Sequence, residues 1–205
     1  MEDNKEPAIS AIVLAAGESR RMGEENKLLL PLSGKPLIVH VLEALAQTSM
    51  FECIVVLGHE ANRVKRALHG FPVTFAVNDR YETGMGSSIH AGVKATSSQA
   101  AGYMICLSDM PLITVEEYDV LLKAFRARYQ TDQKAIVVPS FKGQKGNPVL
   151  LASHHKSAML NHKGKGGCKP VIEQNSKHVF ICEMANNHVL RDIDTPDAYS
   201  NITGK

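Results

Sequence analysis

Positive charge and small residues occur together near the start of the chain, in AAGESRRMGEENK, residues 15–27. Small side chains let the backbone approach a base or a phosphate, and successive N–H groups form a nest for anions. Arg20, Arg21 and Lys27 add positive charge to the same segment. It is not a standard phosphate loop, because no lysine follows Gly23 and the G-x-G-x-x-G spacing is absent. The segment indicates a nucleotide site of another kind; the alternative is a solvated surface turn.

Carboxylates occur in two further places, after an apolar run in the middle of the chain and near its C-terminus. Asp109 follows the apolar run YMICL after one serine, and Asp192 and Asp194 lie near the C-terminus in RDIDTP. In an extended segment, the alternation of Asp192 and Asp194 sends both acids to the same side. Mg²⁺ prefers one or two carboxylates together with phosphate oxygens and waters. These acids predict a divalent-cation site, and the alternative is that each one caps a turn.

Two glycine-containing segments could contact a ligand through their backbones. In GMGSSI, Gly84 precedes Ser87 and Ser88, either of which could cap a helix that runs to about residue 95. The N–H groups at such a helix start can bind an anion or a polar ring, although capping alone also explains the serines. In KGQKGNPVLL, Gly146 and Pro148 shape a hairpin or present backbone groups to a ligand.

Elements that would bring these segments together follow from the apolar pattern. Strands are expected at residues 8–15, 53–57, 72–77, 103–107 and 135–139, and helices at 36–49, 60–69, 87–95 and 114–129. This alternation predicts βαβ units and a mainly parallel sheet, whose ligands bind at the carboxyl ends of the strands. Thr114 and Glu117 form a capping box, and Thr195 precedes a proline as the N-cap of a last helix.

The later part is less regular. A hairpin is expected at 141–147, short strands at 148–151 and 178–183, and a loop at 163–169.

Composition narrows the class of protein. The chain has 205 residues, a net charge of +2 and a pI of about 8.3, which is too balanced for a nucleic-acid-binding protein. The four cysteines form no metal-binding pattern, and no apolar run approaches the length of a membrane span. The polar segment MEDNKEP lacks the features of a signal peptide, so a cytoplasmic protein is expected. We expect a polar tail at residues 1–7 and one domain at 8–205.

An ordered set of motifs goes further than any one of them. Along the chain occur LAAGESRRMG with Lys27, VVLG, GMGSSIHAG, LSDMP, GNPVLL and DIDTPDAY. The set resembles the MobA-like nucleotidyltransferases, and most closely their molybdenum cofactor cytidylyltransferase branch, over residues 8–199. The resemblance implies an α/β, Rossmann-like nucleotide-diphosphate transferase fold with a mainly parallel central sheet and helices on both faces.

The resemblance also implies a reaction. CTP and a molybdopterin-type molybdenum cofactor would give the cytosine dinucleotide cofactor and diphosphate, with Mg²⁺ or alternatively Mn²⁺. The product would serve a xanthine dehydrogenase-type partner enzyme in purine catabolism. Ala16 favours CTP, because guanylyltransferases carry a second glycine at this position. The alternatives are GTP as donor, a sugar phosphate or methylerythritol phosphate as acceptor, and a non-catalytic cofactor-binding chaperone.

Residue roles follow from the same motifs. Lys27 and Arg21 would be catalytic, and Asp109 and Asp194 would bind the metal. The expected nucleotide-binding residues are Leu14, Ala15, Ala16, Gly17, Gly58, Gly84, Ser87 and Ser88, and the expected substrate-binding residues are Gly146, Asn147 and Pro148. Three residues separate Gly23 from Lys27, one more than in the commonest form of the motif, so the loop must absorb an extra residue for Lys27 to reach the site.

Overall fold

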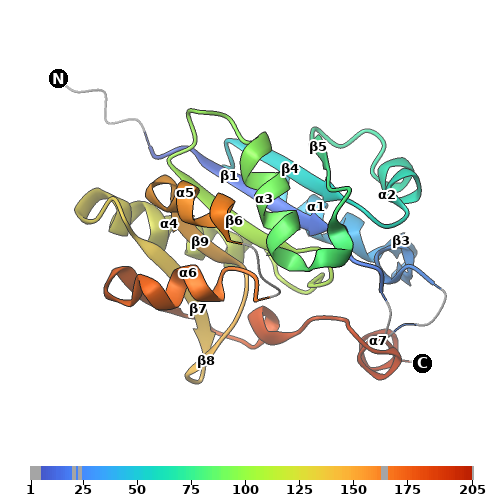
Figure 1. Ribbon diagram of the computed structural model, residues 1–205. Helices are drawn as coiled ribbons and strands as arrows, with labels where there is room; N and C mark the ends of the chain where they lie inside the picture. Colours follow the sequence, from blue (N-terminus) through green and yellow to red (C-terminus); the bar gives the residue numbers. More distant parts are fainter. Residues whose placement is uncertain (1–5, 20–21, 23–24, 163–165, 205) are drawn as a thin grey trace.

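Parallel strands form the centre of the computed structural model, which describes residues 6–19, 22, 25–162 and 166–204 (Figure 1). Within this part of the chain, the main sheet runs in the order β10-β7-β9-β6-β1-β4-β5, and β8 pairs with β7. The strands are β1 (Ile9–Ala15), β4 (Glu52–Leu57), β5 (Thr74–Val77), β6 (Gly102–Leu107), β7 (Ile136–Phe141), β8 (Gln144–Lys145), β9 (Val149–Ala152) and β10 (Val179–Glu183). Strands β2 (Pro31–Leu32) and β3 (Lys35–Pro36) form a separate small hairpin.

The strand directions confirm the expected mainly parallel sheet, with β9 running in the opposite direction to its two neighbours. Strands β5, β4, β1 and β6 are mutually parallel, and β10 is parallel to β7. Strand β9 lies antiparallel to both β6 and β7 and joins the two parallel groups. The carboxyl ends of β1 and β6 therefore meet at the same edge of the sheet.

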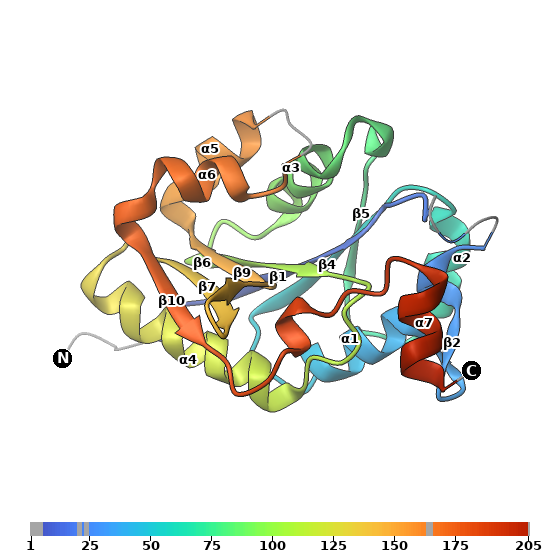
Figure 2. The ribbon, with the colours of Figure 1, turned by 90° about the horizontal axis from the view of Figure 1, so that it is seen from below.

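Helices cover both faces of the sheet (Figure 2). In this view α3 (Met85–Ala95), α5 (Lys156–Asn161) and α6 (Lys169–Gln174) lie on one face, and α1 (Leu37–Leu45) and α4 (Val115–Thr131) lie on the other. Helices α2 (Ala61–Ala67) and α7 (Pro196–Thr203) complete the set in the described residues. None of these helices has the length and apolar character that crossing a bilayer would require.

The apolar run of β1 reflects burial on both sides. Val13 and Ala15 pack into the core beneath α1 and α4, whereas Ile12 packs into the core beneath α3. A strand buried on both faces has no polar alternation, which is why its sequence is almost continuously apolar. At its end, Ala16 and Gly17 continue into the loop that leads to Lys27.

Helix starts show where local patterns succeed and fail. The capping box of Thr114 and Glu117 is confirmed, and the Thr195 side chain accepts a hydrogen bond from the N–H of Ala198, as expected of an N-cap. The expected cap at Ser87 or Ser88 is wrong. Helix α3 begins at Met85 after Gly84, whose φ of 112° is a conformation that L side chains rarely adopt.

Candidate active site

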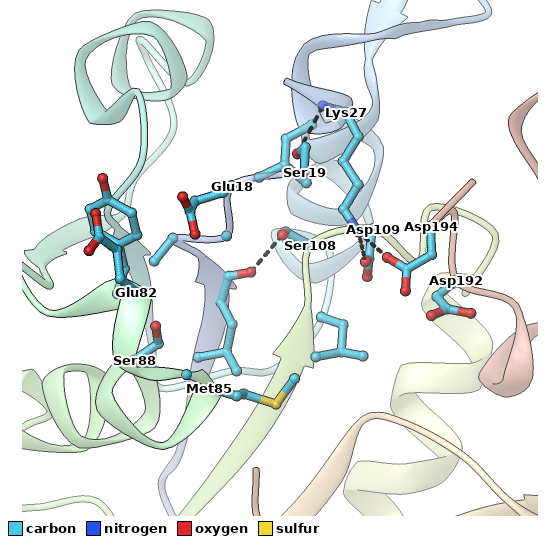
Figure 3. A pocket seen from close by; sticks show the side chains of 17 residues that line it. Glu18, Ser19, Lys27, Glu82, Met85, Ser88, Ser108, Asp109, Asp192 and Asp194 are labelled. Carbon is cyan, nitrogen blue, oxygen red and sulfur yellow. Dashed lines mark hydrogen bonds and ion pairs between the residues drawn. The ribbon is translucent and has the colours of Figure 1, made fainter. Parts of the chain in front are cut away.

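A cavity of about 500 Å³ lies at the carboxyl ends of β1 and β6, beside the start of α3 (Figure 3). This volume is in the range of small-molecule sites, and its position is where open α/β sheets bind ligands. The described residues that line it are Leu14, Ala16, Gly17, Glu18, Ser19, Lys27, Leu28, Tyr81, Glu82, Gly84, Met85, Ser88, Leu107, Ser108, Asp109, Asp192 and Asp194.

Lys27 links two of the carboxylates at one end of the cavity. Its Nζ donates to Asp109 Oδ2 at 2.5 Å and also to Asp194 Oδ1. All three side chains are largely shielded from solvent. Figure 3 shows the lysine side chain extending to this pair, whereas Glu18 and Glu82 lie at the opposite end of the cavity. The cavity thus has one end with an ion-paired cluster and one end bounded by the loops after β1 and β5.

Contacts of Asn26 and Ser19 hold the backbone next to Lys27. Asn26 is the N-cap of the short 3₁₀ helix η2 (Lys27–Leu29), and its side-chain oxygen accepts from the N–H of Leu28 at 3.1 Å. The N–H of Lys27 donates to Ser19 Oγ at 3.1 Å. These two contacts fix the backbone of Lys27 from both sides, so that its side chain reaches the carboxylates.

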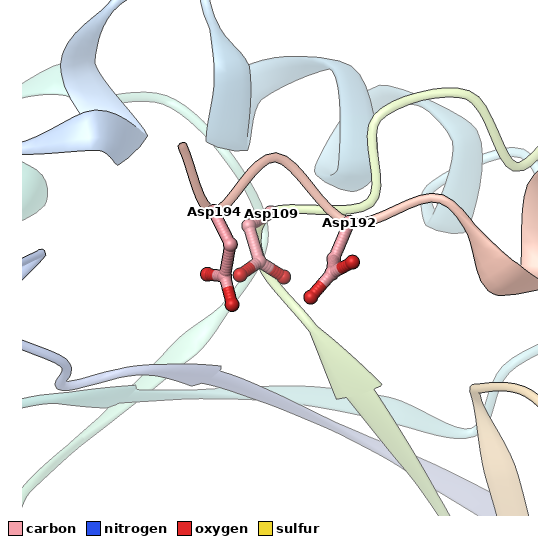
Figure 4. A group of neighbouring side chains, drawn as sticks. All are labelled: Asp109, Asp192 and Asp194. Carbon is pink, nitrogen blue, oxygen red and sulfur yellow. The ribbon is translucent and has the colours of Figure 1, made fainter. Parts of the chain in front are cut away.

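Asp192 completes a group of three carboxylates (Figure 4). One oxygen of each of Asp109, Asp192 and Asp194 lies within 4.8 Å of the others. Asp109 follows β6, and the other two lie on the segment between the 3₁₀ helix η6 (His188–Leu190) and α7. The N–H of Ile193 donates to the carbonyl oxygen of Asp109 at 2.9 Å, which holds the two segments together. Asp192 and Asp194 therefore face the same side, as their alternation predicted.

These carboxylates fit a divalent cation. The Oδ1 atom of Asp109 is buried and has no hydrogen-bond partner among the described residues. A buried polar atom without a partner is costly, and a bound cation would satisfy it. Oxygen-only donors are the ligand type that Mg²⁺ and Mn²⁺ prefer.

The electrostatics of the group favour added positive charge. Burial raises the pKa of Asp109 above its usual value, and Lys27 offsets only part of that rise. The charges of Asp194 and Asp192 add to it. Burial lowers the pKa of Lys27, but the two partner carboxylates raise it by more, so the net shift is upward. One lysine thus balances only part of the negative charge of three carboxylates.

Bare backbone forms the wall next to this cluster. Ser108 Oγ donates to the carbonyl oxygen of Leu14 at 2.6 Å, which ties the ends of β1 and β6 together. A Cβ added to Gly17 would meet no atom within 4 Å, so the space above this glycine is open to a ligand. A Cβ added to Gly58 would instead lie 2.7 Å from that of Ala16 and 2.9 Å from that of Tyr81. Gly58 therefore supports the wall by close packing.

The pattern of the MobA-like NTP transferase domain matches residues 11–179 of this chain. The chain belongs to the MobA-like NTP transferase family. It is therefore a nucleotidyltransferase, and its Rossmann-like fold is that of its structural neighbours.

Several known proteins are similar over nearly the whole chain. The nicotine blue oxidoreductase of Paenarthrobacter nicotinovorans is 26% identical, over 95% of this chain and 96% of its own length. The purine catabolism protein PucB of Bacillus subtilis is 28% identical, over 97% of each chain. The bifunctional protein GlmU of an Exiguobacterium species is 31% identical, but the match spans only 44% of its length.

Among solved structures, the Mycobacterium tuberculosis rv0371c homolog from Mycobacterium sp. strain JC1 superposes with a TM-score of 0.84. It is 25% identical, and the match covers 96% of this chain and 95% of the other.

The structure brings eight of the expected site residues into the lining of the cavity: Leu14, Ala16, Gly17, Lys27, Gly84, Ser88, Asp109 and Asp194. It places six others outside the lining: Ala15, Gly58, Ser87, Gly146, Asn147 and Pro148. Arg21 lies outside the described residues, so its expected role stays a prediction.

Gly146 and Asn147 contact the 3₁₀ helix η6 and do not line the cavity. The N–H of Asn147 donates to the carbonyl oxygen of Val189 at 2.9 Å, and a Cβ added to Gly146 would lie 2.2 Å from that oxygen. This turn therefore packs against the η6 backbone that leads to Asp192 and Asp194. The geometry gives the turn a supporting contact, and any contact with substrate stays a prediction.

Some lining residues were not among the expected ones. Ser108 precedes Asp109 and Met85 lies between Gly84 and Gly86, so their neighbours in sequence offered a signal. The sequence offered no such signal for Tyr81 and Glu82, because they lie on the 3₁₀ helix η3 (Tyr81–Thr83), which no local pattern predicted.

Proposed function

We propose that this nucleotidyltransferase transfers the cytidylyl group of CTP to a molybdopterin-type molybdenum cofactor. The observation that carries the proposal is the cluster of Lys27, Asp109 and Asp194 beside an open, backbone-lined cavity. A phosphate oxygen of the cofactor attacks the α-phosphorus of CTP, and a new P–O bond forms. The bond from the α-phosphorus to the bridging oxygen of the β-phosphate breaks, and diphosphate leaves with that oxygen.

The chain's residues contribute position and charge. Asp109 and Asp194 would hold Mg²⁺ or Mn²⁺, with Asp192 next to them. When bound, the cation supplies neutralisation of the phosphate oxygens. Lys27 stabilises the negative charge that builds up on the phosphates, and Arg21 is proposed to do the same. The backbone from Leu14 to Gly17 holds the nucleoside. Fixed charges in a shielded site are an efficient way to stabilise such a transition state.

The choice of nucleotide and acceptor has separate support. Ala16 lines the cavity at the position where a guanylyltransferase has a second glycine, and this difference supports CTP over GTP. Similarity to a purine catabolism protein over 97% of both chains supports the molybdenum cofactor as acceptor and a xanthine dehydrogenase-type enzyme as its recipient.

A panel of substrates tests the proposal. Purified protein with Mg²⁺ is given CTP, GTP or ATP, each with molybdenum cofactor, a sugar 1-phosphate or methylerythritol phosphate, and diphosphate release is measured. We expect release only with CTP and the molybdenum cofactor. Activity with a sugar phosphate alone would overturn the acceptor, and preferred use of GTP would overturn the donor. Tight cofactor binding without diphosphate release would indicate a chaperone.

A further inference from the structure

Asn78 lies buried directly after β5, where it contacts the first turn of α3. It is 5% exposed, and its backbone N–H donates to the carbonyl oxygen of Leu57 at 2.8 Å. Its side-chain oxygen accepts from the N–H of Arg80 at 3.0 Å. This bond fixes the orientation of the amide, so the Nδ2 group must face α3.

Both hydrogens of Nδ2 are used there. They are donated to Ser87 Oγ at 2.9 Å and to Ser88 Oγ at 3.0 Å. The two serines therefore serve Asn78 as acceptors, and each keeps its single hydroxyl hydrogen for another partner.

The two serines differ in where that hydrogen goes. Ser87 Oγ lies within hydrogen-bond distance of the carbonyl oxygens of Gly84, at 2.8 Å, and Arg80, at 3.0 Å, so its hydrogen stays within the protein. Ser88 lines the cavity and is 6% exposed. Among the described residues, the only hydrogen bond of its hydroxyl is the one accepted from Asn78, so its hydrogen has no acceptor there. A buried donor without a partner in a cavity wall fits a ligand with an acceptor atom.

We propose that Asn78 is a positioning residue that determines the polarity of this wall. By donating to Ser88, it makes the serine a hydrogen-bond donor toward an acceptor oxygen of the nucleoside. This inference rests on the proposed function, since the nucleoside must occupy this end of the cavity. Asn78 itself does not line the cavity and acts only through Ser88.

A nearly isosteric change reverses this polarity. In Asn78→Asp the carboxylate can only accept hydrogen bonds, so Ser88 must turn its hydrogen toward residue 78 and away from the ligand. Ser88→Ala removes the donor outright. If Asn78 acts through Ser88, the two changes remove the same ligand hydrogen bond and do not add.

The test is calorimetric titration of Mg·CTP, without acceptor, into the wild type, both single variants and the double variant. We expect each single variant to raise Kd by about three- to tenfold, the effect of one neutral hydrogen bond. The Kd of the double variant is expected to equal that of the single variant that binds Mg·CTP less tightly. In turnover assays, the variants should show a higher KM for CTP with kcat nearly unchanged. In the control Asn175→Asp, the same chemical change is made in a side chain that donates to Val171 at 2.8 Å, and Kd should not change.

Deoxy-CTP separates two sources of the acceptor oxygen. If Ser88 donates to an oxygen of the base, Ser88→Ala should raise Kd by the same factor for CTP and deoxy-CTP. If it donates to the ribose 2′-oxygen, Ser88→Ala should raise Kd for CTP but not for deoxy-CTP, which lacks that oxygen. Wild-type affinity for CTP in Ser88→Ala, or fully additive effects, would overturn the inference while leaving diphosphate release intact. A wild-type protein that neither binds CTP nor releases diphosphate would overturn the proposed function as well. Ser88→Ala decides the question alone if Asn78→Asp does not fold, which thermal unfolding shows.

Discussion

At the scale of single residues, Lys27 offsets part of the negative charge of the three carboxylates in the candidate site. Its ammonium group lies between Asp109 and Asp194, which come from positions 82 and 167 residues further along the chain. Sequence motifs predicted all three residues, because each lies in a motif with a distinct chemical composition. The participation of Asp192 could not be separated from that of Asp194, since both lie on the same side of one extended segment.

The first prediction concerns catalysis. Lys27→Met and Asp109→Asn should each lower the rate of diphosphate release by about 10²–10³-fold, because each removes a group that neutralises or organises phosphate charge. Lys35→Met is the matched control, since Lys35 pairs with Glu43 on the surface and does not line the cavity. Circular dichroism should show that all three variants are folded. Nearly wild-type turnover in either cavity variant would contradict the assignment.

A second prediction concerns the affinity of the carboxylates for Mn²⁺ in the absence of nucleotide. In the apo protein the Lys27 ammonium group competes with a cation for the same two carboxylates. Lys27→Met should therefore bind Mn²⁺ more tightly than the wild type, by about tenfold or more, given the size of charge interactions at this range. Electron paramagnetic resonance of free Mn²⁺ measures the affinity directly, and Lys35→Met should leave it unchanged. Weaker or equal binding in Lys27→Met would show that the carboxylates do not form the metal site.

At the scale of elements, local sequence patterns predicted most strands and the starts of α4 and α7. The helix starts could be predicted because a cap and its helix are contiguous in the sequence, as with Thr114 and Glu117. The start of α3 was mispredicted because its serines contact a side chain of the segment that precedes the helix. Their hydroxyls meet Asn78, and the positive φ of Gly84 sets the helix start instead.

Tight packing between two elements gives a third prediction. Gly146→Ala should reduce the free energy of unfolding by about 1–3 kcal/mol, because its Cβ would lie 2.2 Å from the carbonyl oxygen of Val189 and something must shift. The shift should also weaken Mn²⁺ binding, because this backbone leads to Asp192 and Asp194. Gly166→Ala is the control, since its Cβ would meet Pro170 at an ordinary 3.6 Å. Urea denaturation and Mn²⁺ titration check both effects, and a stable Gly146→Ala protein with normal Mn²⁺ affinity would refute this support role.

At the scale of the whole molecule, the sheet brings distant segments to one edge. The parallel direction of β1, β4 and β6 could be predicted from the alternation of apolar runs and helical patterns. The reversal of β9 could not, because an isolated short apolar run does not specify its direction or its neighbours. The second wall of the cavity, with Tyr81 and Glu82, also depends on packing that no local motif encodes.

Global stability should depend on pH through a buried histidine away from the cavity. His155 is 2% exposed, and its Nε2 lies 2.8 Å from the carbonyl oxygen of Lys134. Burial lowers the pKa of His155 in the folded protein. The unfolded chain then binds more protons below about pH 6.5, so the free energy of unfolding falls as the pH drops from there toward the lower folded pKa.

Denaturation at pH 7 and pH 5 measures this effect. His155→Gln keeps a donor for Lys134 and removes the titrating group, so it should lose less stability than the wild type between these values. An equal loss in both proteins would exclude His155 as the cause.

Cytidylyl transfer to the molybdenum cofactor is tested most directly by following the α-phosphorus of CTP. CTP labelled at the α-phosphate is incubated with the wild-type protein, Mg²⁺ and molybdenum cofactor, and the products are separated. We expect the label to move into the cofactor, with one diphosphate released per transfer, and both to stop when the cation is chelated or Asp109 is changed to Asn. Label that stays in CTP or appears only in CMP, or transfer that persists in the chelator, would contradict the proposed function.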